Sequence, residues 1–182
     1  MSAQDSKLFV ISGPSGAGKG TLVTRVRERR SNLGLTVSAT TRAPRKGEVD
    51  GVNYFFLTRE EFDRRVANGE FVEWAEVHGN CYGTLVSEVT SKLASGSSLI
   101  LEIDVQGALQ VKERFPEAVL IFIKPPSLEV LRERLVGRGT ETPETIELRM
   151  ANAADELALA DRYDDVVVND DLDRATDELV RV

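Results

Sequence analysis

The sequence predicts an α/β fold: a three-layer α/β/α core with a parallel sheet, an inserted small mixed α/β lobe and a mobile lid. Two patterns support this prediction. Apolar strands alternate with helical segments along most of the chain, as in parallel sheets. Between residues 50 and 83, short strands instead follow one another closely, as antiparallel strands do. We expect a single domain with a core at 1–37, 84–136 and 157–182, a lobe at about 38–83 and a lid at about 137–156.

The composition is that of a soluble globular protein. Hydrophobic residues make up 41% and charged residues 29% of the 182 positions, and no run approaches the ~20 apolar residues of a membrane span. Residues 1–6 lack the apolar core of an export signal, and the single Cys81 excludes an internal disulfide. The net charge of −7 argues against non-specific nucleic-acid binding. We therefore expect a cytoplasmic monomer or weak homo-oligomer with neither nucleic acid nor membrane as a partner.

The most specific motif follows the first apolar strand, at residues 7–12. Gly13, Gly18 and Lys19 fit the spacing G-x-x-x-x-G-K of a phosphate loop. The main-chain N–H groups of such a loop wrap a polyphosphate, because glycine permits tight turns, and the helix N-terminus favours negative charge. The alternative, a glycine-rich turn with an incidental lysine, is disfavoured because a helix at about 18–30 follows the strand. We expect bound polyphosphate here.

The position after the lysine departs from the usual motif. A Ser or Thr that binds Mg²⁺ is usual there, but this chain has Gly20, and the hydroxyl comes one residue later at Thr21. One step along a helix rotates a side chain by about 100°. We therefore expect Thr21 to reach a metal ion only through water.

A polar loop rich in basic residues follows a short strand expected at 35–38. Residues 39–48 contain Pro and Gly and are predicted to lack regular structure, and Arg42, Arg45 and Lys46 lie among them. These cations could be ordinary surface charge. The planar fork of arginine also suits bidentate binding of phosphate, so a second interpretation is an anion clamp.

The inserted lobe is expected to contain two strands and a helix. The predicted elements are a strand at 53–57, a helix at 59–68 with Thr58 as its cap, a strand at 71–77 and a turn at 80–83. Tyr54 and Tyr82 could be plain strand residues, or their hydroxyls could hydrogen-bond an anion near the arginines. Periodicity does not decide between these two roles.

Two carboxylates end a buried strand expected at 98–104. Glu102 and Asp104 are two residues apart, so both are predicted to point to one face. The carboxyl ends of parallel strands share an edge with the glycine-rich loop, which would bring these acids near phosphates and Mg²⁺. The alternative is a pair of solvated acids, which is weaker because Glu102 interrupts an apolar run.

The second half of the chain continues the alternation. We expect helices at 84–95, 105–114, 127–135 (capped by Ser127), 142–160 and 171–182, and strands at 118–124 and 164–169. Arg138 lies in a glycine-flanked hinge between helices that carry Arg134 and Arg149. This is the arrangement of a closing phosphate lid, although a solvated helix connection explains it equally well.

Taken together, these motifs resemble the guanylate kinase family over nearly the whole chain. The matching runs are 13–19, 36–38, 41–45, 47–51, 71–75, 82–84, 102–107, 137–142 and 168–170. The arginine loop and the Glu73-Trp74 strand occur together in this family, which makes the set specific. The resemblance implies a core that binds ATP, a small lobe that binds GMP, and a lid.

The resemblance also implies roles for individual residues. On the ATP side these are Gly13, Pro14, Ser15, Gly16, Ala17, Gly18, Lys19, Gly20, Thr21 and Asn169. On the GMP side they are Ser38, Arg42, Arg45, Tyr54, Glu73, Tyr82, Thr84 and Asp104. The catalytic set is Lys19, Arg42, Arg134, Arg138 and Arg149, and the Mg²⁺ set, acting through water, is Thr21, Glu102 and Asp104.

The implied reaction is transfer of the γ-phosphoryl group of ATP to GMP or dGMP, giving ADP and GDP for purine nucleotide metabolism and GMP recycling. Two alternatives remain. One is an inactive guanylate-kinase-like interaction module, which the intact Lys19 and Arg138 disfavour. The other is a small kinase for AMP or a ribose phosphate. Glu73 favours guanine over adenine, because guanine offers N–H donors that a carboxylate accepts.

Overall fold

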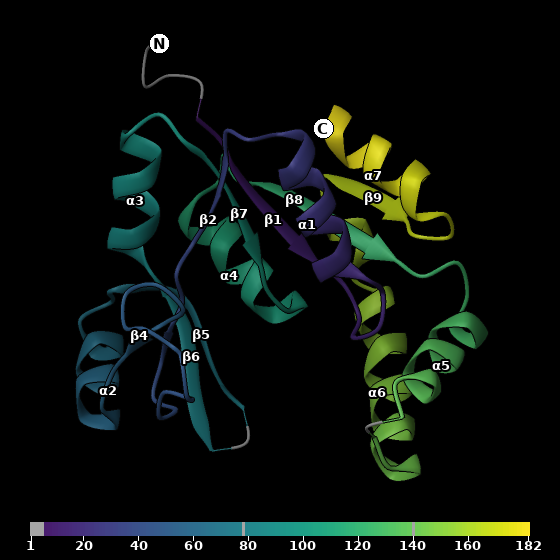
Figure 1. Cartoon of the computed structure of the whole chain (residues 1–182), viewed down its shortest axis with the longest axis horizontal. Helices are drawn as coiled ribbons and strands as arrows, with labels where there is room; N and C mark the ends of the chain where they lie inside the picture. The colour runs from purple at the N-terminus through teal and green to yellow at the C-terminus, as the bar shows by residue number, and fades with distance from the viewer. Residues whose placement is uncertain (1–5, 78, 140) are drawn as a thin grey trace.

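The computed structural model describes residues 6–77, 79–139 and 141–182. Its main sheet is parallel throughout, as predicted, and lies at the centre of the molecule (Figure 1). The strands, in order across the sheet, are β2 (Leu33–Leu35), β7 (Ser98–Glu102), β1 (Leu8–Ser12), β8 (Val119–Lys124) and β9 (Asp165–Val168). The described residues do not include 1–5, where the sequence predicted that no export signal is present. They also do not include Thr140, which belongs to the predicted lid motif.

Side chains of the central strands alternate between two hydrophobic clusters, one on each face. Val10 of β1 packs on one face and Ile11 on the other. The helices over the Val10 face are α3 (Val86–Ala94) and α4 (Val105–Arg114), and those over the Ile11 face are α1 (Lys19–Arg29) and α7 (Leu172–Arg181). Because a strand has a period of two, near-continuous apolar strands can serve both faces at once. The predicted three-layer core is confirmed.

A second, smaller sheet forms the lobe. Its strands, in order, are β4 (Phe55–Phe56), β3 (Ala39–Thr40), β6 (Asn80–Leu85) and β5 (Phe71–Val77), and α2 (Arg59–Ala67) packs beside them. Thr58 caps α2 as predicted, since its hydroxyl accepts a hydrogen bond from the Glu61 N–H at 3.1 Å. Phe62 of α2 stacks on Phe71 with ring centroids 4.3 Å apart. β5 and β6 are antiparallel, but β3 and β4 are parallel, so the lobe sheet is mixed.

Two expectations about the lobe are wrong. Residues 80–83 are not a turn but the first part of β6, and the following helix begins at Val86 rather than at 84. Residues 39–48 are not wholly irregular, because Ala39 and Thr40 pair with β4 and β6. Both strands depend on cross-strand partners, which a local sequence pattern does not reveal.

Two boundaries of the main sheet also differ. The strand expected at 35–38 is β2 at Leu33–Leu35, because Leu35 pairs with Ile100 and residues 36–38 lead to the second sheet. β7 ends at Glu102, so Asp104 does not share a strand face with it. Asp104 instead caps α4, where its side chain accepts a hydrogen bond from the Gly107 N–H at 2.7 Å.

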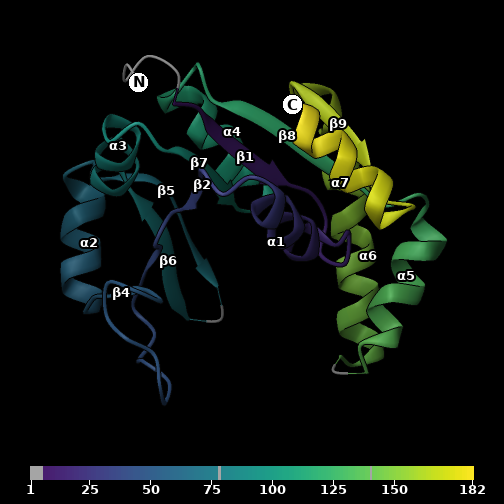
Figure 2. The ribbon, with the colours of Figure 1, turned by 45° about the horizontal axis from the view of Figure 1, so that its top comes forward.

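α5 (Leu128–Gly137) and α6 (Pro143–Leu157) pack as a pair, and the predicted lid spans the end of α5, the connection between the two helices and most of α6. Leu131 and Leu135 of α5 form a cluster with Ile146 and Ala153 of α6. α6 ends at Leu157, earlier than predicted, and a 3₁₀ turn at Ala160–Arg162 precedes β9. Figure 2 shows this pair and the lobe on opposite sides of the core. The division into core, lobe and lid stays a prediction, as does the lid's mobility.

None of the helices in the described ranges is long and apolar enough to cross a membrane.

Candidate active site

The glycine-rich loop connects β1 to α1 at the edge where the parallel strands end. Gly13 has a φ of 140°, and a Cβ on it would lie 2.3 Å from the main-chain oxygen of Ile123. Only glycine fits this position. α1 starts with Gly18 as its N-cap and without a side-chain cap, so its first N–H groups remain available for an anion. The loop therefore has the geometry expected of the predicted phosphate cradle, and the contact with Ile123 adds to the requirement for glycine at position 13.

Lys19 is folded back onto the loop. Its Nζ donates to the carbonyl oxygens of Gly13 at 2.6 Å and Pro14 at 3.1 Å. Burial lowers the pKa of Lys19, while the nearby carboxylates of Glu102 and Glu156 act in the opposite direction. Arg138 adds a smaller lowering effect on the same pKa, so the predicted lid arginine lies within electrostatic range of the loop lysine.

Asn169 and Arg134 brace the loop from the far end of the sheet. Asn169 is buried, and its Nδ2 donates to the Ala17 carbonyl at 2.8 Å. The Arg134 guanidinium in turn donates to the Asn169 carbonyl at 2.8 Å. A Cβ on Gly18 would lie 2.4 Å from the Asn169 amide nitrogen, so the two residues are in close contact. Asn169 thus contacts the loop directly, and Arg134 contacts Asn169.

Arg149 connects α6 to the same loop. Its guanidinium donates to the Ser15 hydroxyl, and its Nε forms an ion pair with Glu141 at 2.8 Å. The sequence pattern indicated Arg149 but missed Glu141. Of the three predicted arginines of the lid region, Arg149 contacts the loop directly and Arg134 contacts it through Asn169. Arg138 is exposed and has only a minor effect on the pKa of Lys19.

Gly20 lies beside the carboxylate of Glu102. A Cβ at position 20 would be 3.7 Å from Glu102 Oε1, an ordinary contact distance. Thr21 is exposed, and within the described residues its hydroxyl makes no hydrogen bond with Glu102. The absence of a side chain at position 20 therefore leaves room for about one methyl group between the loop and the Glu102 carboxylate.

The donor set suits Mg²⁺ but is not a complete cage. Glu102 and Asp104 both act on the pKa of Lys19, so both carboxylates lie near the loop. Over the ranges that the structure describes, no group of three or more His, Cys, Asp or Glu residues could hold a metal ion. Mg²⁺ typically binds through one or two carboxylates together with water and substrate phosphates. The residues present fit that pattern.

The predicted phosphate-binding residues of the lobe converge on Arg42. Its guanidinium lies over the Tyr54 ring at 5.3 Å, and the Tyr54 and Tyr82 rings meet edge to face at 6.3 Å. Glu48 forms a bidentate pair with Arg42, and this carboxylate raises the pKa of Arg42, with a smaller contribution from Tyr82. Arg45 joins the group through its main-chain N–H, which donates to Glu48 at 2.6 Å.

Two carboxylates, the buried Glu73 and the exposed Asp104, lie where the lobe meets α4. The Thr84 hydroxyl donates to Glu73 Oε1 at 2.8 Å, and a Cβ on Gly107 would lie 3.2 Å from Glu73 Oε2 and 3.3 Å from Asp104 Oδ1. Burial raises the pKa of Glu73 to about 6, and the Asp104 charge adds to the shift. Ala39 pairs with Gly83, which brings the preceding Ser38 alongside Thr84. These four predicted residues are therefore brought together.

Several residues of the site were missed by sequence analysis. Glu156 of α6 is close enough to affect the pKa of Lys19, but in sequence it is one of many charged residues on a helix. Gly107 lies in the first turn of α4, where glycine is a poor helix former. That unfavourable position is the signal that could have identified Gly107.

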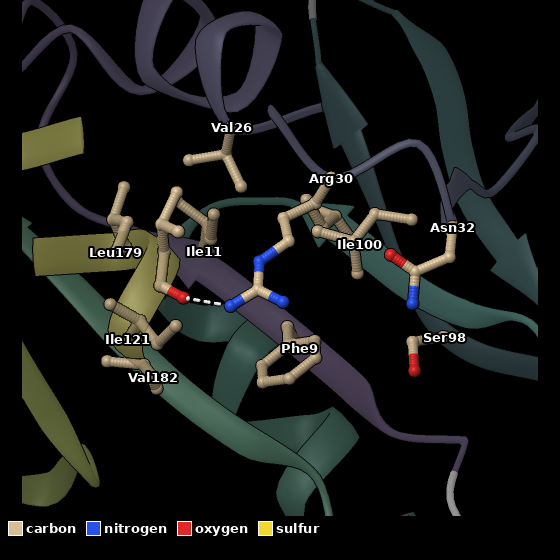
Figure 3. Close-up of a pocket in the computed structure, with 12 residues that line it drawn as sticks. Phe9, Ile11, Val26, Arg30, Asn32, Ser98, Ile100, Ile121, Leu179 and Val182 are labelled. Atoms are coloured by element: carbon tan, nitrogen blue, oxygen red, sulfur yellow. Dashed lines mark hydrogen bonds between the residues drawn. The ribbon is translucent and has the colours of Figure 1, made fainter. Parts of the chain in front are cut away.

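A separate cavity of about 180 Å³, lined by both apolar and polar side chains, lies on the α1 and α7 face of the sheet (Figure 3). Its floor includes Phe9 and Ile121, and the Arg30 guanidinium donates across it to the Val180 carbonyl at 2.8 Å. Phe9 and Ser98 lie toward the amino ends of their strands, opposite the phosphate loop. This cavity is therefore not part of the site described above.

Comparison with known proteins identifies the site's relatives. A family model for guanylate kinase matches residues 5–182. This chain belongs to the guanylate kinase family. A curated guanylate kinase of Halalkalibacterium halodurans is 53% identical over 179 residues, covering 98% of this chain and 88% of that protein. A family member from Gloeobacter violaceus is 56% identical over 177 residues, covering 97% of this chain and 86% of that protein.

The fold of the family is confirmed by a solved relative. The crystal structure of guanylate kinase from Anaplasma phagocytophilum superposes with a TM-score of 0.72 at 37% identity, covering 97% of this chain and 83% of that one. The resemblance and the fold class predicted from the sequence are therefore confirmed. The roles of individual residues within this family framework stay predictions.

Proposed function

We propose that this chain is a guanylate kinase that transfers the γ-phosphoryl group of ATP to GMP, and to dGMP, giving ADP and GDP. The observation that carries the proposal is the position of the buried Glu73 carboxylate. It lies in the lobe and faces Asp104, which belongs to the core that carries the phosphate loop. The product supplies purine nucleotide metabolism and allows GMP to be recycled. The curated relatives at about half identity are described as guanylate kinases, which supports an active kinase rather than an inactive interaction module.

ATP binds at the glycine-rich loop in this proposal. The N–H groups of residues 13–21 surround the phosphates, and Lys19 leaves the Gly13 and Pro14 carbonyls to reach them. Arg138 and Arg149 neutralise the charge that develops on the transferred group. Arg134 and Asn169 bind the same phosphates. Asn169 also holds the loop through its hydrogen bond to the Ala17 carbonyl, and Arg134 holds Asn169.

GMP binds in the lobe. Arg42, Arg45, Tyr54 and Tyr82 hold its phosphate, while Ser38, Glu73, Thr84 and Asp104 surround the base. Guanine presents N1–H and N2–H₂ donors to Glu73 and Asp104, whereas adenine has no such pair and would leave the buried Glu73 carboxylate with Thr84 but without a donor from the base. This difference supports GMP over AMP as the acceptor.

The reaction is an in-line displacement without a covalent enzyme intermediate. An oxygen of the GMP phosphate forms a bond to the γ-phosphorus of ATP, and the bond from that phosphorus to the β,γ-bridging oxygen breaks, leaving ADP. Lys19 and the arginines align the two nucleotides and balance their charge. Glu102, Asp104 and Thr21 would hold Mg²⁺ through water, and the ion would supply charge neutralisation at the ATP phosphates.

A coupled assay of ADP release tests the proposal with four acceptors: GMP, dGMP, AMP and UMP. We expect rapid turnover with GMP, turnover with dGMP and little with AMP or UMP. A preference for AMP would overturn the guanine assignment. Absence of turnover with every acceptor would instead support an interaction module.

We also propose that the protein acts in the cytoplasm as a monomer or weak homo-oligomer, with small nucleotides as its partners and neither nucleic acid nor membrane among them. The net charge of −7 supports the lack of nucleic-acid binding. Sedimentation over a concentration series tests the oligomeric state, and fractionation of the source cells tests the location.

A further inference from the structure

The donors of Arg42 are divided between two edges of its guanidinium. Glu48 accepts from Nη1 at 3.0 Å and from Nη2 at 2.9 Å, and the Ala43 carbonyl accepts from Nη1 at 2.7 Å. A guanidinium has five N–H donors in a fixed plane. Within the described residues these three hydrogen bonds leave the Nε–H and one Nη2–H, which lie on the same edge and point in parallel directions, and the Tyr82 side chain is close enough to raise the pKa of Arg42. That edge matches two oxygens of a phosphate.

The pair is held firmly in place. The side chains of Arg42 and Glu48 are only 16% and 19% exposed. Arg42 lies over the rings of Tyr54 and Phe56, with its Cζ at 5.3 Å and 5.9 Å from their centroids. The two rings pack against the guanidinium, while Glu48 fixes its rotation within its own plane.

Glu48 is itself fixed by the loop it organises. Its Oε2 accepts from the Arg45 N–H at 2.6 Å, and its own N–H donates to the Arg45 carbonyl at 3.0 Å, which closes a tight turn. Gly47 within this turn has a φ of 89°. One carboxylate therefore sets the orientation of the Arg42 side chain and the main-chain position of Arg45.

We propose that Glu48 is a positioning residue of the acceptor site: it holds Arg42 by one edge so that the opposite edge is presented to the GMP phosphate. The inference rests on the proposed function and deepens it. Glu48 stays bound to Arg42 when the nucleotide enters, because the phosphate uses donors that Glu48 leaves free. In the opposing arrangement Glu48 is a competitor of the GMP phosphate: both bind the same donors of Arg42, and the phosphate displaces Glu48 when the nucleotide enters.

The two arrangements predict opposite effects of Glu48→Gln. Glutamine keeps the length of the side chain and one acceptor oxygen, but loses the charge and the bidentate pair. If Glu48 positions Arg42, the KM for GMP rises about 10- to 100-fold, as expected for loss of charge-assisted hydrogen bonds, while the KM for ATP changes less than about twofold. A competitor would instead give a lower KM for GMP.

Binding measurements separate positioning from a general loss of structure. Calorimetric titration of Glu48→Gln with GMP and with guanosine, which lacks the phosphate, should show weaker binding of GMP and unchanged binding of guanosine. Glu61→Gln is the matched control, because Glu61 also pairs with two arginines of the lobe, Arg64 and Arg65. The control should bind both ligands as the unaltered protein does.

Each outcome decides something. An unchanged or lower KM for GMP in Glu48→Gln and Glu48→Ala, with the KM for ATP preserved, overturns the positioning role. Equal weakening of guanosine and GMP also overturns it, since the effect would then not act through the phosphate. If the unaltered protein does not phosphorylate GMP, the proposed function itself fails, and that result is obtained independently of any variant.

Discussion

The phosphate loop offers main-chain groups from one continuous segment, whereas the acceptor lobe offers side chains from several distant segments. Gly13 to Lys19 follow one another in sequence, and their conformation is set by glycine and by the start of α1. The proposed acceptor site combines Glu73 of β5 with Thr84 of β6 and Asp104 before α4. The two halves of one site are therefore specified in different ways.

This difference indicates which kind of substitution should damage each half of the site. The loop is sensitive to an added atom, because a Cβ on Gly13 would collide with the main chain of Ile123 and a Cβ on Gly18 would collide with the Asn169 side chain. The lobe fails when a partner is removed, because its charged groups are paired, as in Arg42 with Glu48. The following changes test this contrast, beginning with the largest expected effect.

Lys19→Met removes the only side-chain cation that starts within the loop. We expect kcat to fall by about 10²- to 10³-fold, the loss typical of one group that stabilises a transition state, with a much smaller change in the KM for GMP. Steady-state kinetics measure both. Lys92→Met, which removes a lysine paired with Glu88 on α3, is the control. Near-normal turnover of Lys19→Met would contradict the assigned role.

Gly13→Ala tests the loop by adding one carbon. A methyl group at a φ of 140° and 2.3 Å from the Ile123 oxygen forces the main chain apart, so we expect a loss of about 2–5 kcal/mol in the free energy of unfolding. Urea denaturation measures it. Gly96→Ala is the control, since Gly96 also has a positive φ of 84° but open space around it. The control should lose about 1–2 kcal/mol. Equal losses would remove the steric argument.

Glu73→Gln tests the lobe, where function and stability should move in opposite directions. The pKa of Glu73, raised to about 6 by burial, means that the ionised side chain destabilises the folded protein above that pH. We expect the variant to gain about 2 kcal/mol at pH 7–8, and the gain to shrink as the pH falls from 6 to below 4.5. Its KM for GMP should rise about 10- to 100-fold. Loss of stability at pH 8 would contradict the prediction.

The same carboxyl predicts the smallest effect, a pH dependence of base recognition. As the pH falls through about 6, Glu73 takes up a proton and stops accepting from guanine, so affinity should fall by up to about tenfold per pH unit. The phosphate of GMP also titrates near pH 6, so guanosine is the appropriate ligand for calorimetry. The dependence should disappear in Glu73→Gln. Persistence of the full dependence in that variant would assign it to another group.

Local patterns predicted much of this molecule correctly. The alternating apolar strands predicted the layers, the caps Thr58 and Ser127 marked helix starts, and the glycine spacing predicted the phosphate loop. These features depend on residues within a few positions of one another. Hydrogen-bonding and steric preferences of that range can be read from a single segment.

Tertiary structure alone decided the rest. Asn80–Leu85 is a strand because β5 and β3 lie beside it, and Asp104 caps a helix instead of ending a strand. The approach of Glu156 to Lys19 and of Gly107 to Glu73 also appears only when distant segments meet. The amino-acid sequence by itself determined the layers of the core and the phosphate loop, since both follow from local periodicity and backbone freedom. Which side chains face one another across the proposed acceptor site depended on packing between elements that no local pattern encodes.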